Sequence, residues 1–412
     1  MKKKLFTILV SFIALFFISC GKDAISESSL SNEISNEVTT VIKNKYIPLN
    51  YTDMKAVWIS QFDSSAVFCE GVMRDEHEFA LLARMTAKNV ASAGFNTVIF
   101  QIRPNGDSFY TSEIFPESRY VTGKYGRKIS YDALEIFINA FHEYKLSVQA
   151  WINPYRLVTV NEINDIPDKY AVKKMYIDGK LPVVNGRLYF DPSSGEAVNL
   201  IVDGAIEALE KYQFDGLHMD DYFYPTLEEY FDAKSFAKSE KDELVDFREE
   251  SVNNLISKLY SAVKKTDSRL IFGISPAGNL KSVRKNYCAD VFKWCSSDNY
   301  IDYIMPQIYF GFLHGSCPFD ETVEAWANII KNKNIKFYVG ITLSKAVSGE
   351  QDKYAVTDEG KNEWIIHDDV VQRSVKYINE NSRCNGFSVF CYQYIFNSVT
   401  GEANQAFAEI AK

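Results

Sequence analysis

The residues with the clearest chemical potential form one motif, residues 215–225 with the sequence DGLHMDDYFYP. A carboxylate at the end of a β-strand can act as a nucleophile, as a base or as a stabiliser of a cationic transition state. Successive side chains of a strand face opposite sides, so His218 and Asp220 share one face and the apolar residues share the other. We therefore predict Asp220 as a catalytic carboxylate. Asp221 is the second catalytic candidate, and it reaches the same site only if the chain turns after Asp220; otherwise it is a loop cap or an ion-pair partner.

A second acid would be needed for one class of reaction, the cleavage of glycosidic bonds. Such cleavage usually requires two carboxyl groups, about 5–5.5 Å apart for retention and about 6.5–9.5 Å apart for inversion. The spacing of the sequence does not choose the second group, so the stereochemical outcome stays open. The candidates are Asp221, Asp107, Glu113, Glu117 and Asp191.

The elements that must position these residues alternate regularly from residue 55 onward. Strand patterns are expected at 56–60, 97–103, 147–153, 216–220, 270–275, 303–309, 337–342 and 386–392. Helical patterns are expected at 75–93, 131–144, 196–212, 249–265, 287–295, 321–333, 368–381 and 401–411. Eight βα units without a glycine-rich nucleotide motif predict an α/β fold, a TIM (β/α)8 barrel, rather than an open doubly wound sheet.

The connections of this predicted barrel differ between its two ends. Helix-to-strand connections such as 94–96 and 145–146 are short, whereas the strand-to-helix segments are long. The long βα loops are 104–130, 154–194, 221–247 and 343–367. Because βα loops build the active sites of such barrels, the pattern predicts an enzyme-like or binding site at the C-terminal ends of the strands.

Strand alternation also predicts a polar and aromatic lining at the barrel mouth. Unsatisfied buried polar groups cost about 1–3 kcal/mol each, so they are expected to bind a ligand or, alternatively, to satisfy one another as a polar plug. Aromatic faces and amides suit a polyhydroxylated ring. The expected substrate-binding residues are Trp58, Arg103, Asn105, Trp151, Asn153, Tyr222, Ser275, Gln307, Tyr309 and Tyr392.

The N-terminus carries an export pattern. Three lysines precede an apolar run at 5–18 and then Ser19 and Cys20, which predicts a lipoprotein signal peptide over residues 1–20 with Cys20 as the lipidated residue. An ordinary secretory signal or an uncleaved anchor are the alternatives. Residues 21–50 have the composition of a flexible tether, and residues 51–412 form the predicted catalytic domain. We therefore expect an extracytoplasmic protein, anchored to a membrane of the cell envelope.

Composition excludes several classes of protein. A hydrophobic content of 46% excludes a mainly disordered chain. A formal net charge of -9 disfavours nucleic acid as a partner, because nothing offsets the repulsion from phosphate. The six cysteines after Cys20 are too sparse for a disulfide scaffold, although one or two disulfides would fit. The five histidines are scattered, so no metal and no cofactor is expected.

Six motifs in chain order carry a resemblance to a known family. They are AVWIS at 56–60, QIRPNGD at 101–107, AWINPYR at 150–156, the motif at 215–225, GISP at 273–276 and MPQIY at 305–309. Together they resemble the glycosyl-hydrolase-like 10 lipoprotein family, also called domain-of-unknown-function family 187, over residues 55–396. The resemblance implies a TIM-barrel glycoside hydrolase of the bacterial envelope. One similar lipoprotein cleaves peptidoglycan glycan strands stripped of stem peptides, which implies that polysaccharide or a related amino-sugar polymer as the substrate.

The same strand also echoes the DGxDxDxE motif of chitinase-like family 18 enzymes. His218 replaces one aspartate of that motif, and Tyr222 stands in the place of its acidic glutamate. The substrate-assisted mechanism of those enzymes is therefore not carried over. Two alternatives to the leading interpretation remain: a non-catalytic glycan-binding lipoprotein, and a hydrolase of an exopolysaccharide or a host glycan.

Overall fold

The computed structural model describes residues 46–63, 67–220, 223–396 and 401–410. The chain divides after Tyr46, and the fold described below belongs to Ile47–Lys412. The predicted signal peptide with Cys20, most of the predicted tether, and the Asp221–Tyr222 pair lie outside the described residues.

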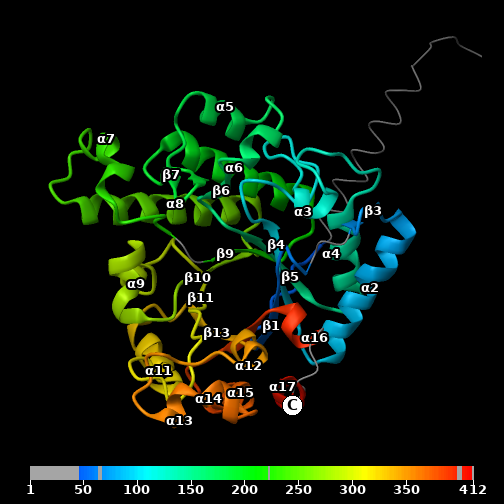
Figure 1. The fold of residues 1–412 in the computed structure, drawn as a ribbon, viewed down its shortest axis with the longest axis vertical. Helices are drawn as coiled ribbons and strands as arrows, with labels where there is room; N and C mark the ends of the chain where they lie inside the picture. Colours follow the sequence, from blue (N-terminus) through cyan, green and yellow to red (C-terminus); the bar gives the residue numbers. More distant parts are fainter. Residues whose placement is uncertain (1–45, 64–66, 221–222, 397–400, 411–412) are drawn as a thin grey trace, which may run out of the picture. The chain divides into compact units, whose positions relative to one another are not determined.

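A parallel sheet forms the centre of the molecule (Figure 1). Its order is β12-β11-β10-β9-β5-β4-β1-β14-β13, and all of its recorded strand pairs are parallel. The strands are β1 (Met54–Ile59), β4 (Thr97–Arg103), β5 (Ser147–Ile152), β9 (Gly216–Asp220), β10 (Ile271–Ser275), β11 (Tyr303–Ile304), β12 (Lys336–Phe337), β13 (Val339–Thr342) and β14 (Gly386–Phe390).

The sheet closes through a seventh barrel strand that is split into β12 and β13 by Tyr338. The Tyr338 N–H donates to the Ile304 carbonyl at 3.0 Å, and the Gly340 N–H donates to the Pro306 carbonyl at 2.9 Å. These bonds join the two ends of the strand order, so the predicted (β/α)8 barrel is confirmed. The sixth strand was expected over 303–309 but is regular only at Tyr303–Ile304, because Pro306 has no N–H to continue the ladder.

Helices surround the strands (Figure 1). The helices with eight or more residues are α2 (Glu76–Ser92), α4 (Ala133–Glu143), α6 (Gly195–Lys211), α8 (Leu244–Thr266), α9 (Leu280–Tyr287), α11 (Phe319–Ile329), α15 (Val370–Glu380) and α17 (Gly401–Ile410). The helix α2 begins at a capping box formed by Asp75 and Glu78. None of the described helices is both long and apolar enough to cross a membrane.

One helix prediction is wrong. A single helix was expected over 287–295, but the chain forms α9 and then the short helix α10 (Val291–Trp294). Cys288 lies between them with a φ of 49°, a left-handed conformation that ends a helix.

The barrel interior is packed with large side chains. Ala56, Trp58, Ile99, Trp151, Tyr303, Met305 and Tyr338 form a buried cluster inside the strands. Gly273 makes room for one of these rings, because a Cβ atom at this position would lie 1.9 Å from the Tyr303 ring. The interior below the mouth is therefore a solid core rather than a channel.

Two long βα loops carry secondary structure of their own. The loop after β5 forms a three-stranded antiparallel sheet of β6 (Arg156–Thr159), β8 (Arg187–Tyr189) and β7 (Val183–Val184), together with α5 (Ala171–Ile177). The loop after β9 contains the 3-10 helix η2 (Glu229–Phe231) and α7 (Ala233–Phe236). These additions follow the carboxyl ends of their strands, where the predicted site lies.

Candidate active site

A cavity of about 420 Å³ opens at the carboxyl ends of the barrel strands. Several of its walls come from strand ends, and the others come from the loops that follow them. Its lining consists of Trp58, Ser60, Gln61, Phe62, Gln101, Asn105, Tyr120, Trp151, Asn153, Arg156, Arg187, Asp220, Gln307, Tyr309 and Phe390. Seven predicted site residues are thus brought together here: Trp58, Asn105, Trp151, Asn153, Asp220, Gln307 and Tyr309.

Asp220 is held at the end of β9 by a chain of oriented amides. The Asn153 Nδ2 donates to the Asp220 carboxylate, and the Asn153 Oδ1 accepts from the Gln101 Nε2 at 2.7 Å. The Gln101 Oε1 in turn accepts the Gln61 backbone N–H at 2.7 Å. Each bond fixes the orientation of the next amide, so the N–H donor of Asn153 is directed at Asp220, where it favours the ionised carboxylate.

This chain of amides continues to the three-stranded antiparallel sheet β6-β8-β7 in the loop after β5, which we call the loop sheet. The Asn105 Nδ2 donates to the Gln61 Oε1 at 3.1 Å, and the Arg187 Nη1 donates to the Asn105 Oδ1 at 3.1 Å. Arg187 belongs to β8, so the antiparallel loop sheet is tied to the barrel through side chains that line the cavity.

Aromatic rings supply the apolar part of the cavity wall. Phe390 lies between Trp58 and Tyr309, with ring centroids 6.3 Å and 6.1 Å away. Phe62 and Tyr120 make an edge contact at 5.7 Å. Flat apolar rings beside amide donors and acceptors can hold a sugar, because the rings cover its C–H faces and the amides bond its hydroxyls.

His218 faces the interior as predicted but lies below the cavity. The Trp58 Nε1 donates to the His218 Nε2 at 3.4 Å, and the Nδ1 lies 2.7 Å from the Tyr303 hydroxyl. An indole N–H only donates, so the Nε2 accepts, and we infer that the proton is on the Nδ1. Complete burial lowers the pKa of His218 to about 3. The imidazole is therefore neutral and supports the Trp58 ring from below.

The expectation that Arg103 faces the interior is wrong. Its guanidinium lies 4.7 Å from the centre of the Phe115 ring, and its Nη1 donates to the Ile201 carbonyl in α6 at 3.3 Å. The register between β4 and β5 shifts between Gln101 and Arg103, which ends the alternation predicted from a regular strand. Arg103 therefore ties β4 to the helical layer.

Tyr392 and Ser275 are also absent from the lining. The strand β14 ends at Phe390, so the alternation does not reach Tyr392, which belongs to α16 (Tyr392–Phe396). The Tyr392 hydroxyl accepts from the Asn89 Nδ2 in α2 at 3.1 Å. Ser275 pairs with Asp220 in the sheet register but is fully buried. The prediction that Tyr392 faces the mouth is wrong, and Ser275 lies behind the cavity wall.

The other candidate acids lie elsewhere in the molecule. Asp107 is fully buried, where desolvation raises its pKa, and it accepts the Asn105 N–H at 2.8 Å. Glu117 accepts from the Tyr170 hydroxyl at 3.2 Å, and Asp191 accepts from Ser193 and Ser235. Glu113 lies on the exposed loop surface. Among the described lining residues, Asp220 is the only carboxylate. The remaining candidate, Asp221, lies outside the described residues.

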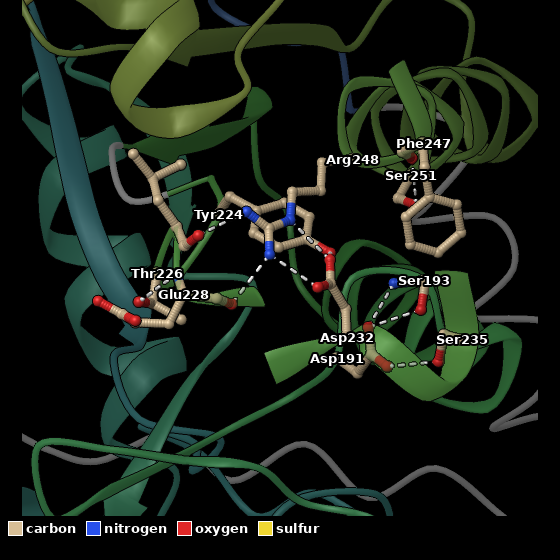
Figure 2. Close-up of polar contacts among 11 residues, drawn as sticks. Asp191, Ser193, Tyr224, Thr226, Glu228, Asp232, Ser235, Phe247, Arg248 and Ser251 are labelled. Atoms are coloured by element: carbon tan, nitrogen blue, oxygen red, sulfur yellow. Dashed lines mark hydrogen bonds and ion pairs between the residues drawn. The ribbon is translucent and has the colours of Figure 1, made fainter. Parts of the chain in front are cut away.

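The loop that follows Asp220 is fixed by a buried ion pair (Figure 2). The Asp232 carboxylate accepts two bonds of 2.7 Å from the Arg248 Nε and Nη2, and it also accepts from the Tyr224 hydroxyl. Arg248 in addition donates to the Leu227 and Glu228 carbonyls at 3.0 Å. One guanidinium thus ties residues 224–232 to the helix α8.

Sequence reasoning missed the contribution of the loop sheet. Arg156 falls inside the AWINPYR motif, but Arg187 stands 31 positions later without a motif of its own. Both line the cavity because β6 and β8 pair. No group of three or more His, Cys, Asp or Glu in the described region could hold a metal ion, and the six cysteines described there are all free.

Comparisons with known proteins identify relatives of this chain. The chain is 32% identical to glycosyl hydrolase YngK of Bacillus subtilis over 314 residues, which cover 70% of this chain and 60% of that protein. It is 28% identical to glycosyl hydrolase DigH of Escherichia coli K12 over 308 residues, 66% of each chain. The match therefore covers 60% of YngK and 66% of DigH, which is less than two thirds of the length of each relative.

Solved structures show the same fold at low sequence identity. The glycoside hydrolase domain of PgaB (BpsB) from Bordetella bronchiseptica aligns with a TM-score of 0.54 and 10% identity, covering 85% of this chain and 98% of that one. The catalytic domain of β-amylase from Paenibacillus polymyxa gives 0.52 and 10%, with coverages of 88% and 98%. The model of the family described as glycosyl hydrolase-like 10 matches residues 53–356, and this chain belongs to that family.

Proposed function

We propose that this protein hydrolyses glycosidic bonds in a polysaccharide of the cell envelope, with Asp220 as an active-site carboxylate. The observation that carries the proposal is the position of Asp220. It ends β9 in a cavity walled by aromatic rings and amides, and it is the only acid among the described lining residues. Membership of a glycosyl hydrolase-like family supports the same reaction class.

In the proposed reaction Asp220 acts at the anomeric carbon, and Asp221 supplies the second carboxyl group. Water adds across the glycosidic C–O bond: its hydroxyl goes to the anomeric carbon and its proton to the leaving oxygen. Trp58, Trp151 and Tyr309 would hold the sugar ring, and the Asn153 amide would keep Asp220 ionised through the bond described above.

Peptidoglycan glycan strands are the proposed substrate, and Cys20 is the proposed site of a lipid anchor outside the cytoplasm. The basic start, the apolar run at 5–18 and the Ser19-Cys20 pair support export and lipidation. The resemblance of the six motifs to an envelope lipoprotein family supports the glycan. A host glycan or an exopolysaccharide would use the same chemistry with a different polymer.

The test is mass spectrometry of the products formed from purified peptidoglycan strands, with and without stem peptides. Asp220→Asn is expected to lower the cleavage rate about 10²- to 10⁴-fold while the protein stays folded. Asp165→Asn, at an exposed position of the loop sheet region, is the matched control and should cleave normally. Full activity of Asp220→Asn would contradict the assignment. Glycan binding without any new reducing ends would instead support the non-catalytic alternative.

A further inference from the structure

Two guanidinium groups line the cavity on the side of the loop sheet. Arg156 begins β6 and Arg187 begins β8, and both side chains are half-buried. Arg156 pairs with Tyr189 and Thr159 pairs with Arg187, with a register shift between these two pairs. The β6–β8 pairing thus brings both positive charges into the lining of the same cavity.

The hydrogen bonds of these arginines fix their orientation but leave donors unused. The Arg156 Nε donates to the Pro104 carbonyl at 3.2 Å. The Arg187 Nη1 donates to the Asn105 Oδ1 at 3.1 Å and to the Leu157 carbonyl at 2.5 Å. Within the described residues, no other hydrogen bond occupies the two Nη atoms of Arg156 or the Nε and Nη2 of Arg187. The hydrogen bonds that hold both guanidinium groups thus go to neutral oxygen atoms.

No described carboxylate forms an ion pair with either arginine. Glu162 is the nearby acid that acts electrostatically on Arg187, but it bonds Thr159 and pairs with Arg119 at 2.6 Å. Asp107 acts on Arg156 only at a distance, since its pKa is influenced by that charge without a bond between them. A half-buried pair of guanidinium groups without a counter-ion favours an anion from outside, because the anion offsets their mutual repulsion.

From this geometry we propose that Arg156 and Arg187 form a subsite for a carboxylate on the substrate, so that the enzyme acts on an acidic glycan. The inference rests on the proposed function. A carboxylate matches the planar fork of a guanidinium, which can bind both of its oxygens. Two sugar types carry such a group: a residue with an ether-linked lactate, as in peptidoglycan, and a uronic acid.

The first experiment measures binding rather than cleavage. Asp220→Asn protein is titrated by calorimetry with peptidoglycan strands free of stem peptides, with the same strands after reduction of the carboxyl groups to alcohols, and with a polyuronate. Carboxyl reduction is expected to weaken binding about 10- to 100-fold. Preference for the peptidoglycan strands or for the polyuronate identifies the source of the carboxylate. Equal affinity for native and reduced strands would overturn the subsite.

Arginine variants then locate the effect. Arg156→Gln and Arg187→Gln, each in the Asp220→Asn background, should weaken binding of the native strands about 10-fold or more. Carboxyl reduction should weaken the binding of either variant only slightly further, because both changes remove the same contact. Arg269→Gln is the control, since Arg269 is exposed in the connection between α8 and β10, away from the cavity. If the losses of binding free energy caused by an arginine variant and by carboxyl reduction add fully, the two groups do not share a contact.

The outcomes separate the two proposals. Cleavage of native and reduced strands at equal rates by the unmodified protein would support the glycosidase and reject the carboxylate subsite. Carboxylate-dependent binding without cleavage would support the subsite and reject the hydrolase.

Discussion

Two aspartates twelve positions apart have opposite environments. Asp220 ends β9 at the cavity wall, with 7% of its surface exposed, and it accepts from the neutral Asn153 amide. Asp232 lies in the loop that follows, with its side chain fully buried, and it is bonded to the Arg248 guanidinium by two hydrogen bonds. The first carboxylate faces a space large enough for a ligand, whereas the second is enclosed by its partners.

The difference separates a carboxylate open to a ligand from one enclosed within the protein. A buried charge must be paired, and removal of one partner leaves the other uncompensated at high cost. Asp232 satisfies this requirement within the protein and so stabilises the loop. Asp220 lines a cavity and is oriented by an amide, so a ligand in the cavity could reach it. The same residue type thus has a structural role in one place and a proposed catalytic role in the other.

The largest expected effect comes from the same substitution made at both positions. Asp232→Asn should lower the free energy of unfolding by about 3–5 kcal/mol, because it leaves the buried Arg248 charge without a counter-charge. Asp220→Asn should change that free energy by less than about 1 kcal/mol. Urea denaturation followed by circular dichroism measures both. Equal destabilisation by the two variants would show that Asp220 is a structural carboxylate as well.

A smaller effect should follow from removing the amide that orients Asp220. Asn153→Leu keeps the number and branching of the side-chain heavy atoms, and it should lower kcat/KM about 10- to 100-fold, because a hydrogen bond to a charged group is worth about 1.5–3 kcal/mol. The circular dichroism spectrum and the free energy of unfolding should stay close to those of the unmodified protein, because the substitution removes a hydrogen bond at the cavity wall. An unchanged kcat/KM would mean that the Asn153 bond does not contribute to the reaction.

The smallest expected effect concerns an exposed ion pair. Arg84 and Glu143 join α2 to α4 at 2.6 Å, and both side chains are about half exposed (57% and 50%). Arg84→Ala should lower the free energy of unfolding by about 0–1 kcal/mol, because solvent screens the pair. The same denaturation measurement applies, and 0.5 M NaCl should reduce the effect further. A loss as large as that of Asp232→Asn would remove the contrast between buried and exposed pairs.

The barrel could be predicted from the sequence because strand and helix patterns alternate along the chain from residue 55 onward. Alternation placed Asp220, Trp58 and Trp151 correctly, since each lies inside a regular ladder. It failed at Arg103, where the register shifts, and at Tyr392, where the strand has already ended. Alternation describes a regular strand, so it predicts neither a register shift nor the end of a strand.

Long-range contacts escaped prediction for a different reason. Arg187 reaches the cavity through the pairing of β8 with β6, and short loop strands of three or four residues carry little periodic signal. The Asp232–Arg248 pair likewise joins residues 16 positions apart across two elements. Neither contact follows from local pattern, because each depends on how a loop folds back on itself.

Neighbouring strands of the barrel are paired over different lengths, and this difference has a consequence for local stability. The strand β11 matches β10 at two residue pairs and β12 at two, whereas β4 matches β5 at six. Gln307 adds one isolated bridge to Ala277 and one to Gly340, so each side of β11 still has fewer matched pairs than the β4–β5 ladder. We expect the local opening free energy on this side to be lower and its amides to exchange with solvent sooner. Gln307 and Tyr309 stand on this side, and Asp220 stands beside the long ladders. We therefore expect local opening to change the Gln307 side of the cavity before the Asp220 side.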